Sequence, residues 1–362
     1  MSQLRVGVIG LGEVAQVVHL PVLESLPDLY RVTAVCDISA TLRDLVGDRY
    51  RVEHRYDDVA EMVRETPSLD CVLVLNSDEY HTESVVTALG AGLHVLVEKP
   101  MCLSPREAEE ILAARDRSGR IVMVGYMRRF APAFEAAKSR LASLGRINYA
   151  RVHDIIGRNQ LMIDQTARVV RPSDLPQSAL EERWARGSAL VREAIGDVDP
   201  VLGGTYRLLC GLGSHDLSAM RELLGRPRRV AAARQWRDGG YIAALLEYDD
   251  FVAVYETGVD DQVRFDAHLE VYGDLAELRV QYDTPYIRHF PTTLVVKQTV
   301  GEGYEETVVR PHLKDPYTHE LEAFHAAVTA GAPVKTTPED YVEDMELFVQ
   351  IIRALEQASD QA

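Results

Sequence analysis

Cysteine is scarce in this sequence, and long apolar runs are missing. Only four of the 362 residues are cysteine, and they lie far apart with no CxxC pair, so the sequence favours neither a disulfide framework nor a structural zinc site. No apolar run approaches the roughly 20 residues that a membrane-spanning helix needs. The N-terminal residues do not resemble a signal peptide. We therefore expect a cytoplasmic, unprocessed protein.

Positive charge is also in short supply. Lysine and arginine number 39 against 56 aspartates and glutamates, which gives a formal net charge of −17 at pH 7. Such an excess of negative charge repels nucleic-acid phosphates and anionic lipid surfaces. The sequence therefore argues against nucleic-acid and membrane partners. The histidines are scattered without metal-ligand spacing, so we expect no metal site.

The first third of the chain alternates β-branched runs with amphipathic stretches. This pattern predicts an α/β domain over residues 1–126, with a parallel sheet between two layers of helices. Strands are predicted at Leu4–Ile9, Arg31–Cys36, Cys71–Leu75, His94–Val97 and Ile121–Tyr126. Helices are predicted at Val14–Leu26, Ala40–Val46, Val59–Arg64, Ser84–Ala91 and Pro105–Arg117.

From about residue 127 onward, strand-like runs follow one another with few helices between them. They are predicted at Ile147–Ile156, Arg229–Trp236, Tyr241–Tyr248, Phe251–Gly258, Arg264–Tyr272, Ala276–Tyr282, Thr293–Thr299 and Glu305–Val309. Consecutive strands favour an open, mostly antiparallel sheet, so we expect an α+β domain over residues 127–362. Final helices are predicted at Thr318–Ala330 and Pro338–Gln357, and they could pack back on the first domain.

A charged helix is predicted over Gln177–Ile195. Its larger apolar residues fall on one helical stripe, namely Leu180, Trp184, Val191 and Ile195. We expect this helix to pack on the second domain. A lid over a substrate cleft or an oligomer contact is the alternative.

The first predicted strand is followed by the hexapeptide Gly10-Leu11-Gly12-Glu13-Val14-Ala15, a GxGxxA form of the dinucleotide-binding fingerprint. Gly10 permits the tight turn, and Gly12 lets a pyrophosphate approach the backbone. Ala15 allows close packing of helix and strand, and N–H groups of the helix that begins near Val14 would hold the phosphates. We therefore predict cofactor contacts at Gly10, Gly12, Glu13, Val14 and Ala15.

Asp37 ends the second predicted strand. This spacing fits a carboxylate that hydrogen bonds the ribose hydroxyls of adenosine, which favours NAD over NADP because the carboxylate repels a 2′-phosphate. Arg43 could still accept NADP, so NADP is the alternative cofactor. A purely local role of Asp37, as a cap of the following turn, is the other interpretation.

The tripeptide Glu98-Lys99-Pro100 lies where a predicted strand ends, and open parallel sheets bind ligands at the carboxyl ends of their strands. This tripeptide and several other segments resemble the glucose–fructose oxidoreductase, inositol dehydrogenase and rhizopine catabolism (Gfo/Idh/MocA) family. The resemblance covers nearly the whole chain. Its further segments are the glycine turn, Asp37, Tyr80-His81, residues 88–95, Gly125–Phe130, Gly203-Gly204, Gly213-Ser214-His215-Asp216 and residues 320–355.

The resemblance implies a Rossmann domain followed by an open α/β domain, with the active site between them and a sheet that commonly forms homodimers or homotetramers. It implies that Glu98 contacts the nicotinamide ribose, that Lys99 binds the reacting hydroxyl, and that His215 exchanges the hydroxyl proton. Pro100 is often preceded by a cis bond in this family. Further cofactor contacts are expected at Asn76, His81, Lys99 and Arg129.

One position departs from the family pattern. Many members have an aspartate four residues before the histidine, where this chain has Gly211. Asp216 or Asp154 could replace that acid, the histidine could act alone, or the catalytic set could differ. The expected substrate contacts are Lys99, Asp154, Arg158, His215 and Asp216.

The leading functional hypothesis is an NAD(P)-dependent oxidoreductase that interconverts a secondary alcohol and a ketone of a sugar, polyol or sugar derivative by hydride transfer at nicotinamide C4. Two alternatives stay open. One is a redox-type glycosidase, or a related epimerising or eliminating enzyme, that recycles bound NAD. The other is a dinucleotide-binding regulator without turnover.

Overall fold

The structure, a computed structural model, describes residues 2–359 and consists of two compact units. Unit 1 comprises Met1–Gly125, Ala167–Asp197 and Glu320–Glu343. Unit 2 comprises Tyr126–Thr166, Val198–His319 and Asp344–Ala362. The chain therefore passes between the units repeatedly, and the boundary expected at residue 126 is only the first of these crossings.

Unit 1 is built on a parallel sheet of six strands in the order β3-β2-β1-β4-β5-β6. The strands are β1 (Leu4–Ile9), β2 (Tyr30–Cys36), β3 (His54–Tyr56), β4 (Cys71–Val74), β5 (His94–Glu98) and β6 (Val122–Gly125). The order reverses between β1 and β4, which creates the switch point where open α/β sheets bind ligands. This arrangement confirms the predicted Rossmann-type sheet.

The predicted strands of unit 1 are those with apolar runs, and the structure explains why. Every residue of β4 is buried, as expected for a parallel strand covered on both faces. The short β3 was not predicted, because its sequence His-Arg-Tyr is half-buried and has no apolar run.

The helices of unit 1 begin at recognisable caps. Ser39, Asp58 and Ser104 each accept a backbone N–H from the first turn of the helix that follows. A helix over residues 13–25, which includes a π-helical segment at Ala15–His19 and α1, follows β1. The helices that pack around the sheet include α1 (Leu20–Ser25), α2 (Ala40–Tyr50), α3 (Val59–Glu65), α4 (His81–Gly90) and α5 (Pro105–Ser118).

Residues 320–343 also belong to unit 1, and they extend from α11 (Pro316–Ala330) into α12 (Pro338–Ser359). The hydroxyl of Tyr30 donates to the Leu321 carbonyl at 2.6 Å. The hydroxyl of Thr336 donates to the carbonyl of Val124, also at 2.6 Å. These bonds attach the C-terminal part of the chain to β2 and to the edge strand β6 of the first sheet.

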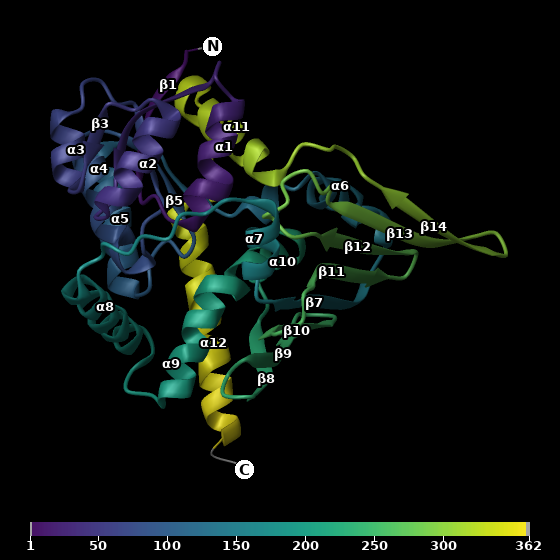
Figure 1. Cartoon of the computed structure of the whole chain (residues 1–362). Helices are drawn as coiled ribbons and strands as arrows, with labels where there is room; N and C mark the ends of the chain where they lie inside the picture. Colours follow the sequence, from purple (N-terminus) through teal and green to yellow (C-terminus); the bar gives the residue numbers. More distant parts are fainter. Residues whose placement is uncertain (1, 360–362) are drawn as a thin grey trace. The chain divides into compact units, whose positions relative to one another are not determined.

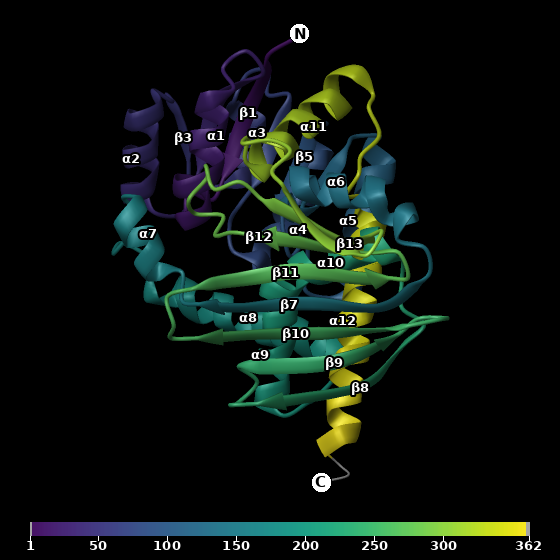
Figure 2. The same cartoon turned by 90° about the vertical axis from the view of Figure 1, so that its right-hand side faces the viewer.

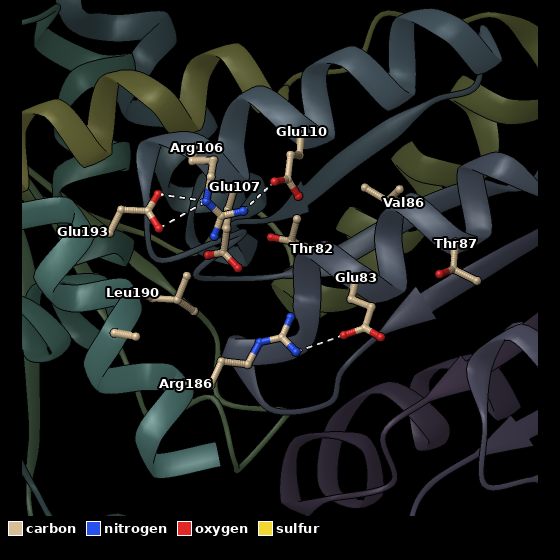
Figure 3. Close-up of a pocket in the computed structure, with 11 residues that line it drawn as sticks. Thr82, Glu83, Val86, Thr87, Arg106, Glu107, Glu110, Arg186, Leu190 and Glu193 are labelled. Atoms are coloured by element: carbon tan, nitrogen blue, oxygen red, sulfur yellow. Dashed lines mark hydrogen bonds and ion pairs between the residues drawn. The ribbon is translucent and has the colours of Figure 1, made fainter. Parts of the chain in front are cut away.

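The charged helix α8 has the predicted bounds, Gln177–Ile195, but the expectation that it packs on the second domain is wrong. It belongs to unit 1, where Arg186 pairs with Glu83 of α4 at 2.9 Å (Figure 3). The apolar stripe misled the prediction, because Trp184 on that stripe is 79% exposed. Ion pairs with distant segments, which leave no local pattern, hold α8 in unit 1 together with the buried Leu190 and Val191.

Unit 2 is built on a sheet of eight strands in the order β14-β13-β12-β11-β7-β10-β9-β8, which lie side by side in Figure 2. All neighbouring strands are antiparallel except β7 and β10. This confirms the mostly antiparallel second sheet. The strands are β7 (Ile147–Gly157), β8 (Arg229–Trp236), β9 (Tyr241–Glu247), β10 (Val252–Asp260), β11 (Phe265–Gly273), β12 (Ala276–Tyr282), β13 (Thr293–Val300) and β14 (Gly303–Val309).

The segment around His215, where no helix was predicted, is helical. Helix α9 (Pro200–Leu208), the π-helical segment Leu209–Gly213 and α10 (Ser214–Leu224) follow one another without a break. Gly213 is needed for close packing, because a Cβ there would lie 2.4 Å from the Tyr255 hydroxyl. The other helices of unit 2 include α6 (Pro132–Arg140) and α7 (Gln160–Thr166) (Figure 1).

Two findings bear on the scarcity of cysteine and of long apolar runs. The four cysteine side chains are buried and form no disulfide. Within residues 2–359, no helix has both the length and the apolar character required to span a membrane.

Candidate functional site

The glycine turn after β1 has the geometry that a dinucleotide requires. Gly10 has φ +86°, and a Cβ on it would lie 2.4 Å from the Asn76 backbone nitrogen, so no side chain fits there. At Gly12 the situation is reversed, because a Cβ would have no atom within 4 Å. The open space beside Gly12 fits a pyrophosphate approaching the start of the following helix. Ala15 is fully buried on that helix, and Val14 and Glu13 precede it.

Alanine substitutions at the two glycines are expected to have opposite effects. Gly10→Ala should lower the free energy of unfolding by about 2–4 kcal/mol, because it combines a positive φ with a backbone clash. Gly12→Ala should leave stability unchanged within about 1 kcal/mol but weaken NAD⁺ binding at least about tenfold, since its Cβ fills the phosphate space. Urea denaturation and calorimetric titration with NAD⁺ measure the two effects. A Gly12→Ala variant that binds NAD⁺ as wild type does would contradict this assignment.

The Asp37 carboxylate is held beside the glycine turn. Its Oδ2 accepts the N–H of Leu11 and its Oδ1 accepts the N–H of Ser39, both at 2.8 Å. Burial raises the pKa of Asp37, although these two N–H groups and the charge of Arg43 oppose that shift. Arg43 also donates to the Asp37 carbonyl at 2.6 Å. The carboxylate is therefore fixed where the fingerprint expects an adenosine ribose.

Glu98, the last residue of β5, is buried and paired with a residue that the sequence reasoning missed. Its Oε1 lies 2.7 Å from His19 Nε2, and its Oε2 accepts the Lys99 N–H at 3.0 Å. Burial alone would raise the pKa of Glu98, but the hydrogen bond from His19 and the nearby charges hold it below its ordinary value. Nothing in the local pattern distinguishes His19 from a core residue of the first helix. The pair fixes an ionised carboxylate at the carboxyl end of the sheet.

Lys99 is half-buried and is followed by a cis peptide bond to Pro100. The ring of His81 is buried between two loops, with Nδ1 2.8 Å from the Pro100 carbonyl oxygen and Nε2 3.0 Å from that of Asn76. Burial lowers the pKa of His81. The Asn76 side chain in turn donates to the Ser84 hydroxyl at 3.0 Å. The geometry therefore supports a positioning role for His81, which links the loops that follow β4 and β5.

In unit 2, His215 is half-buried in the first turn of α10. Gly211 lies one helical turn earlier, and a Cβ on it would meet no atom within 4 Å. An aspartate at this position would therefore have room. The departure from the family pattern is a chemical difference and not a steric one.

Asp154 and Asp216, two candidate substitutes for the missing acid, lie together in a buried cluster with Arg128 (the Arg128 cluster). Arg128 Nη1 is 3.0 Å from Asp154 Oδ2 and also pairs with Asp216 Oδ1. All three side chains are at most 3% exposed. Sequence reasoning placed both aspartates among the substrate contacts, whereas here they surround an arginine away from solvent.

The Arg128 cluster holds two acids beside a single guanidinium. Burial raises the pKa of Asp216 well above its ordinary value, against the attraction of Arg128, and the neighbouring Asp154 adds to the rise. Burial would lower the pKa of Arg128, but the two acids raise it instead. The guanidinium also lies over the rings of Phe265 and Tyr282, 5.5 and 5.2 Å from their centroids. Burial and the neighbouring Asp154 therefore favour the protonated form of Asp216.

The raised pKa of Asp216 predicts a pH-dependent stability. Because the folded-state pKa exceeds the unfolded value of about 3.9, the contribution of Asp216 is fully present below that value and is lost as the pH rises toward the folded pKa. Wild-type stability should therefore fall with rising pH more steeply than that of Asp216→Asn. Urea midpoints over a pH series test this, with Asp261→Asn, an exposed aspartate of the same unit, as control. Equal slopes for wild type and Asp216→Asn would refute the expectation.

Two further arginines among the predicted site residues have clear partners. Arg129 is buried and pairs with Glu222 at 2.5 Å, within unit 2. Arg158 has a side chain that is 77% exposed and pairs with Asp261 at 3.0 Å. The structure thus places Arg129 in an internal ion pair and Arg158 on the surface of the second unit.

Comparisons with known proteins agree with the fold and the nucleotide-binding turn. Residues 4–126 match the model of an oxidoreductase family with an NAD-binding Rossmann fold, the Gfo/Idh/MocA family. Inositol 2-dehydrogenase 2 of Saccharopolyspora erythraea is 28% identical over 345 residues, a match that covers 91% of this chain and 85% of that protein.

A second relative and a solved structure extend the comparison. Myo-inositol 2-dehydrogenase of Thermotoga maritima is 29% identical over 216 residues, which are 54% of this chain and 63% of that protein, so less than two thirds of this relative is matched. The aldose-aldose oxidoreductase of Caulobacter crescentus, complexed with glycerol, shares the fold with a TM-score of 0.74 and 19% identity, over 99% of this chain and 98% of that chain. Residues 4–126 therefore match the NAD-binding Rossmann fold of the Gfo/Idh/MocA oxidoreductase family, and most of the chain is similar to an inositol 2-dehydrogenase.

Proposed function

We propose that the protein is an NAD(P)-dependent oxidoreductase that interconverts a secondary alcohol and a ketone on a sugar, polyol or sugar derivative. The observation that carries the proposal is Lys99 beside the buried Glu98–His19 pair, at the carboxyl end of β5 in a dinucleotide-binding sheet. Two relatives named as inositol dehydrogenases support a polyol or sugar substrate. The net negative charge is compatible with a neutral substrate that is bound by hydrogen bonds.

Different residues bind the cofactor, orient the reacting hydroxyl and transfer its proton. NAD, when bound, supplies the hydride acceptor. Gly10, Gly12 and Asp37 hold its pyrophosphate and adenosine ribose, and Glu98, kept ionised by His19, accepts hydrogen bonds from the nicotinamide ribose. Lys99 donates a hydrogen bond to the reacting hydroxyl. His215 takes the proton from that hydroxyl during oxidation and returns it during reduction.

We also propose a homodimer or homotetramer formed through the sheet of unit 2. One face of this sheet carries exposed apolar side chains, among them Tyr149 and Leu245, beside the Arg151–Glu256 ion pair at 2.8 Å. Such a mixed face is typical of an interface between copies. Light scattering on a size-exclusion column would refute this proposal if it gave the mass of a single chain.

The experiment that tests the activity measures reduced-nicotinamide absorbance with NAD⁺ or NADP⁺ against inositols, free sugars, amino sugars and glycosides. Wild type is compared with Lys99→Ala and with the control Lys297→Ala, which removes a lysine paired with Glu277 on the second sheet. A signal that Lys99→Ala loses and Lys297→Ala keeps would support the proposal. If NAD⁺ binds but no compound of the panel gives reduced-nicotinamide absorbance, the oxidoreductase proposal would be overturned. A redox glycosidase that retains its cofactor, or a regulator, would then be favoured.

A further inference from the structure

Residues 167–176, which we call the strap, run along the nucleotide-binding edge of unit 1. The side-chain amide of Gln16 forms two hydrogen bonds with the backbone of Val170, donating at 3.0 Å and accepting at 2.9 Å. Arg171 pairs with Glu13 at 2.9 Å. Both Glu13 and Gln16 belong to the helix that follows the glycine turn, so one end of the strap is fixed beside the phosphate site.

The strap makes its second attachment at the N-terminus of α2. One carboxylate oxygen of Asp174 accepts the Ser39 hydroxyl at 2.6 Å. The other accepts the Thr41 N–H at 2.9 Å and the Thr41 hydroxyl at 3.1 Å. A single carboxylate thus takes three donors at a helix end, which is a place that favours anions.

Helix α8 anchors the strap from its other end. Glu193 accepts from both Ser104, at 2.9 Å, and Arg106, at 3.2 Å, on the start of α5, and Arg186 pairs with Glu83 on α4 (Figure 3). A pocket of about 500 Å³ lies among these three helices. The anchoring ion pairs stand on either side of it, so α8 is held at several points along its length (Figure 3).

The second attachment coincides with the position that distinguishes NAD from NADP. A carboxylate at the end of the second strand binds the ribose 2′-hydroxyl, which is the oxygen that carries the additional phosphate in NADP. Asp37 occupies that position, and the Ser39 N–H donates to its Oδ1 at 2.8 Å. Ser39 and Thr41, at the start of α2 beside Asp37, supply hydroxyl and N–H donors that could bind a phosphate on the ribose 2′-oxygen.

We propose that Asp174 is a specificity-determining residue that excludes NADP by taking the donors a 2′-phosphate would need. The inference rests on the proposed function, because it requires a nicotinamide dinucleotide at Asp37. The Asp174 carboxylate resembles a phosphate in its charge and in the hydrogen bonds that it accepts. It therefore competes with a 2′-phosphate for the same donors. A ribose with a free 2′-hydroxyl needs only Asp37 and meets no such competition.

Two electrostatic features support the exclusion. The hydrogen bonds from Ser39 and Thr41 lower the pKa of Asp174 to about 2, so the group carries its charge at neutral pH. Arg43, the residue that could have accepted a 2′-phosphate, donates instead to the Asp37 carbonyl and lies 3.8 Å from Asp57. The region therefore presents two carboxylates to an incoming phosphate, together with an arginine that already has partners.

Calorimetric titration with NAD⁺ and NADP⁺ tests the proposal on wild type, Asp174→Ala, Asp174→Asn and the control Asp197→Ala. Asp197 is an exposed aspartate of the same unit that pairs with Arg192. We expect Asp174→Ala to tighten NADP⁺ binding roughly 10- to 100-fold, because charge-assisted hydrogen bonds become available to the phosphate. NAD⁺ binding should change less than about threefold. Asp174→Asn should fall between wild type and Asp174→Ala, and Asp197→Ala should match wild type.

The possible outcomes separate this inference from the proposed function. An unchanged ratio of the NADP⁺ and NAD⁺ dissociation constants in Asp174→Ala would overturn the inference and leave the oxidoreductase proposal intact. Equal weakening of both nucleotides would show that the strap only supports the fold, and would also overturn it. Failure of wild type to bind either nucleotide would overturn the proposed function and this inference with it. Circular dichroism of each variant checks that the fold is retained.

Discussion

Replacing Arg128 by methionine is expected to lower the free energy of unfolding by about 3–5 kcal/mol, because it leaves two buried acids without their cation. The side chains of Asp154 and Asp216 are fully buried, so bulk solvent does not take the place of the guanidinium. Methionine fills much of the vacated volume, so the loss reports mainly on charge and hydrogen bonds. The contacts of Arg128 with the Phe265 and Tyr282 rings disappear as well.

Denaturation in urea, followed by circular dichroism, measures this loss. The matched control is Arg158→Met, an exposed arginine of the same unit whose ion pair with Asp261 should contribute less than about 1 kcal/mol. Combining Arg128→Met with Asp216→Asn should recover part of the stability, because the amide cannot become a second buried anion once the guanidinium is gone. If Arg128→Met were as stable as Arg158→Met, the Arg128 cluster would have no structural importance.

The Arg128 cluster shows where prediction from the sequence ends. Asp154 and Asp216 were both predicted as functional candidates. Arg128, which pairs with both, was noted only as part of Gly125–Phe130, a segment that resembles the family. Arg128 and Asp216 are 88 positions apart in the chain, and no local periodicity links them. Sequence patterns report which side chains are charged, whereas folding decides which of them meet.

The fold was predicted more completely than the site, for a physical reason. Hydrophobic periodicity is a local property, so β1, β8 and β12 were predicted with their observed bounds. The bounds of α8 were also predicted from its helical period, but its place in unit 1 depends on contacts with distant residues of α4 and α5. The helical run over residues 200–224 was not predicted at all.

The nucleotide site was predictable for the same local reason, since its glycines and Asp37 follow strands at fixed spacing. The strap was not predictable. Gln16 and Val170 are 154 positions apart, and Ser39 and Asp174 are 135 positions apart. An irregular segment gives no periodic signal, so only the three-dimensional arrangement shows that it contributes to the cofactor edge.

Lys99→Ala and His215→Ala are each expected to lower kcat by about 100- to 10,000-fold, the usual range for loss of a group that handles a proton or orients the reacting atom. The dissociation constant of NAD⁺ should change less than about threefold in His215→Ala, because His215 is not among the expected cofactor contacts and Gly12 and Asp37 are intact. Single-turnover measurements of nicotinamide reduction separate this loss from slow product release. The control variants are Lys297→Ala and His289→Ala, the second of which removes an exposed histidine.

Chemical rescue and a double variant distinguish direct participation from a structural effect. Ethylamine should restore part of the activity of Lys99→Ala, and imidazole part of that of His215→Ala, if each side chain acts through its own nitrogen. Lys99 belongs to unit 1 and His215 to unit 2, so independent structural damage in the two units would multiply the losses. Two groups that act on one hydroxyl behave otherwise, because the second removal takes away little once the first has disabled the step. We therefore expect the double variant to be little slower than the slower single variant, and a fully multiplicative loss would contradict a shared role in moving one proton.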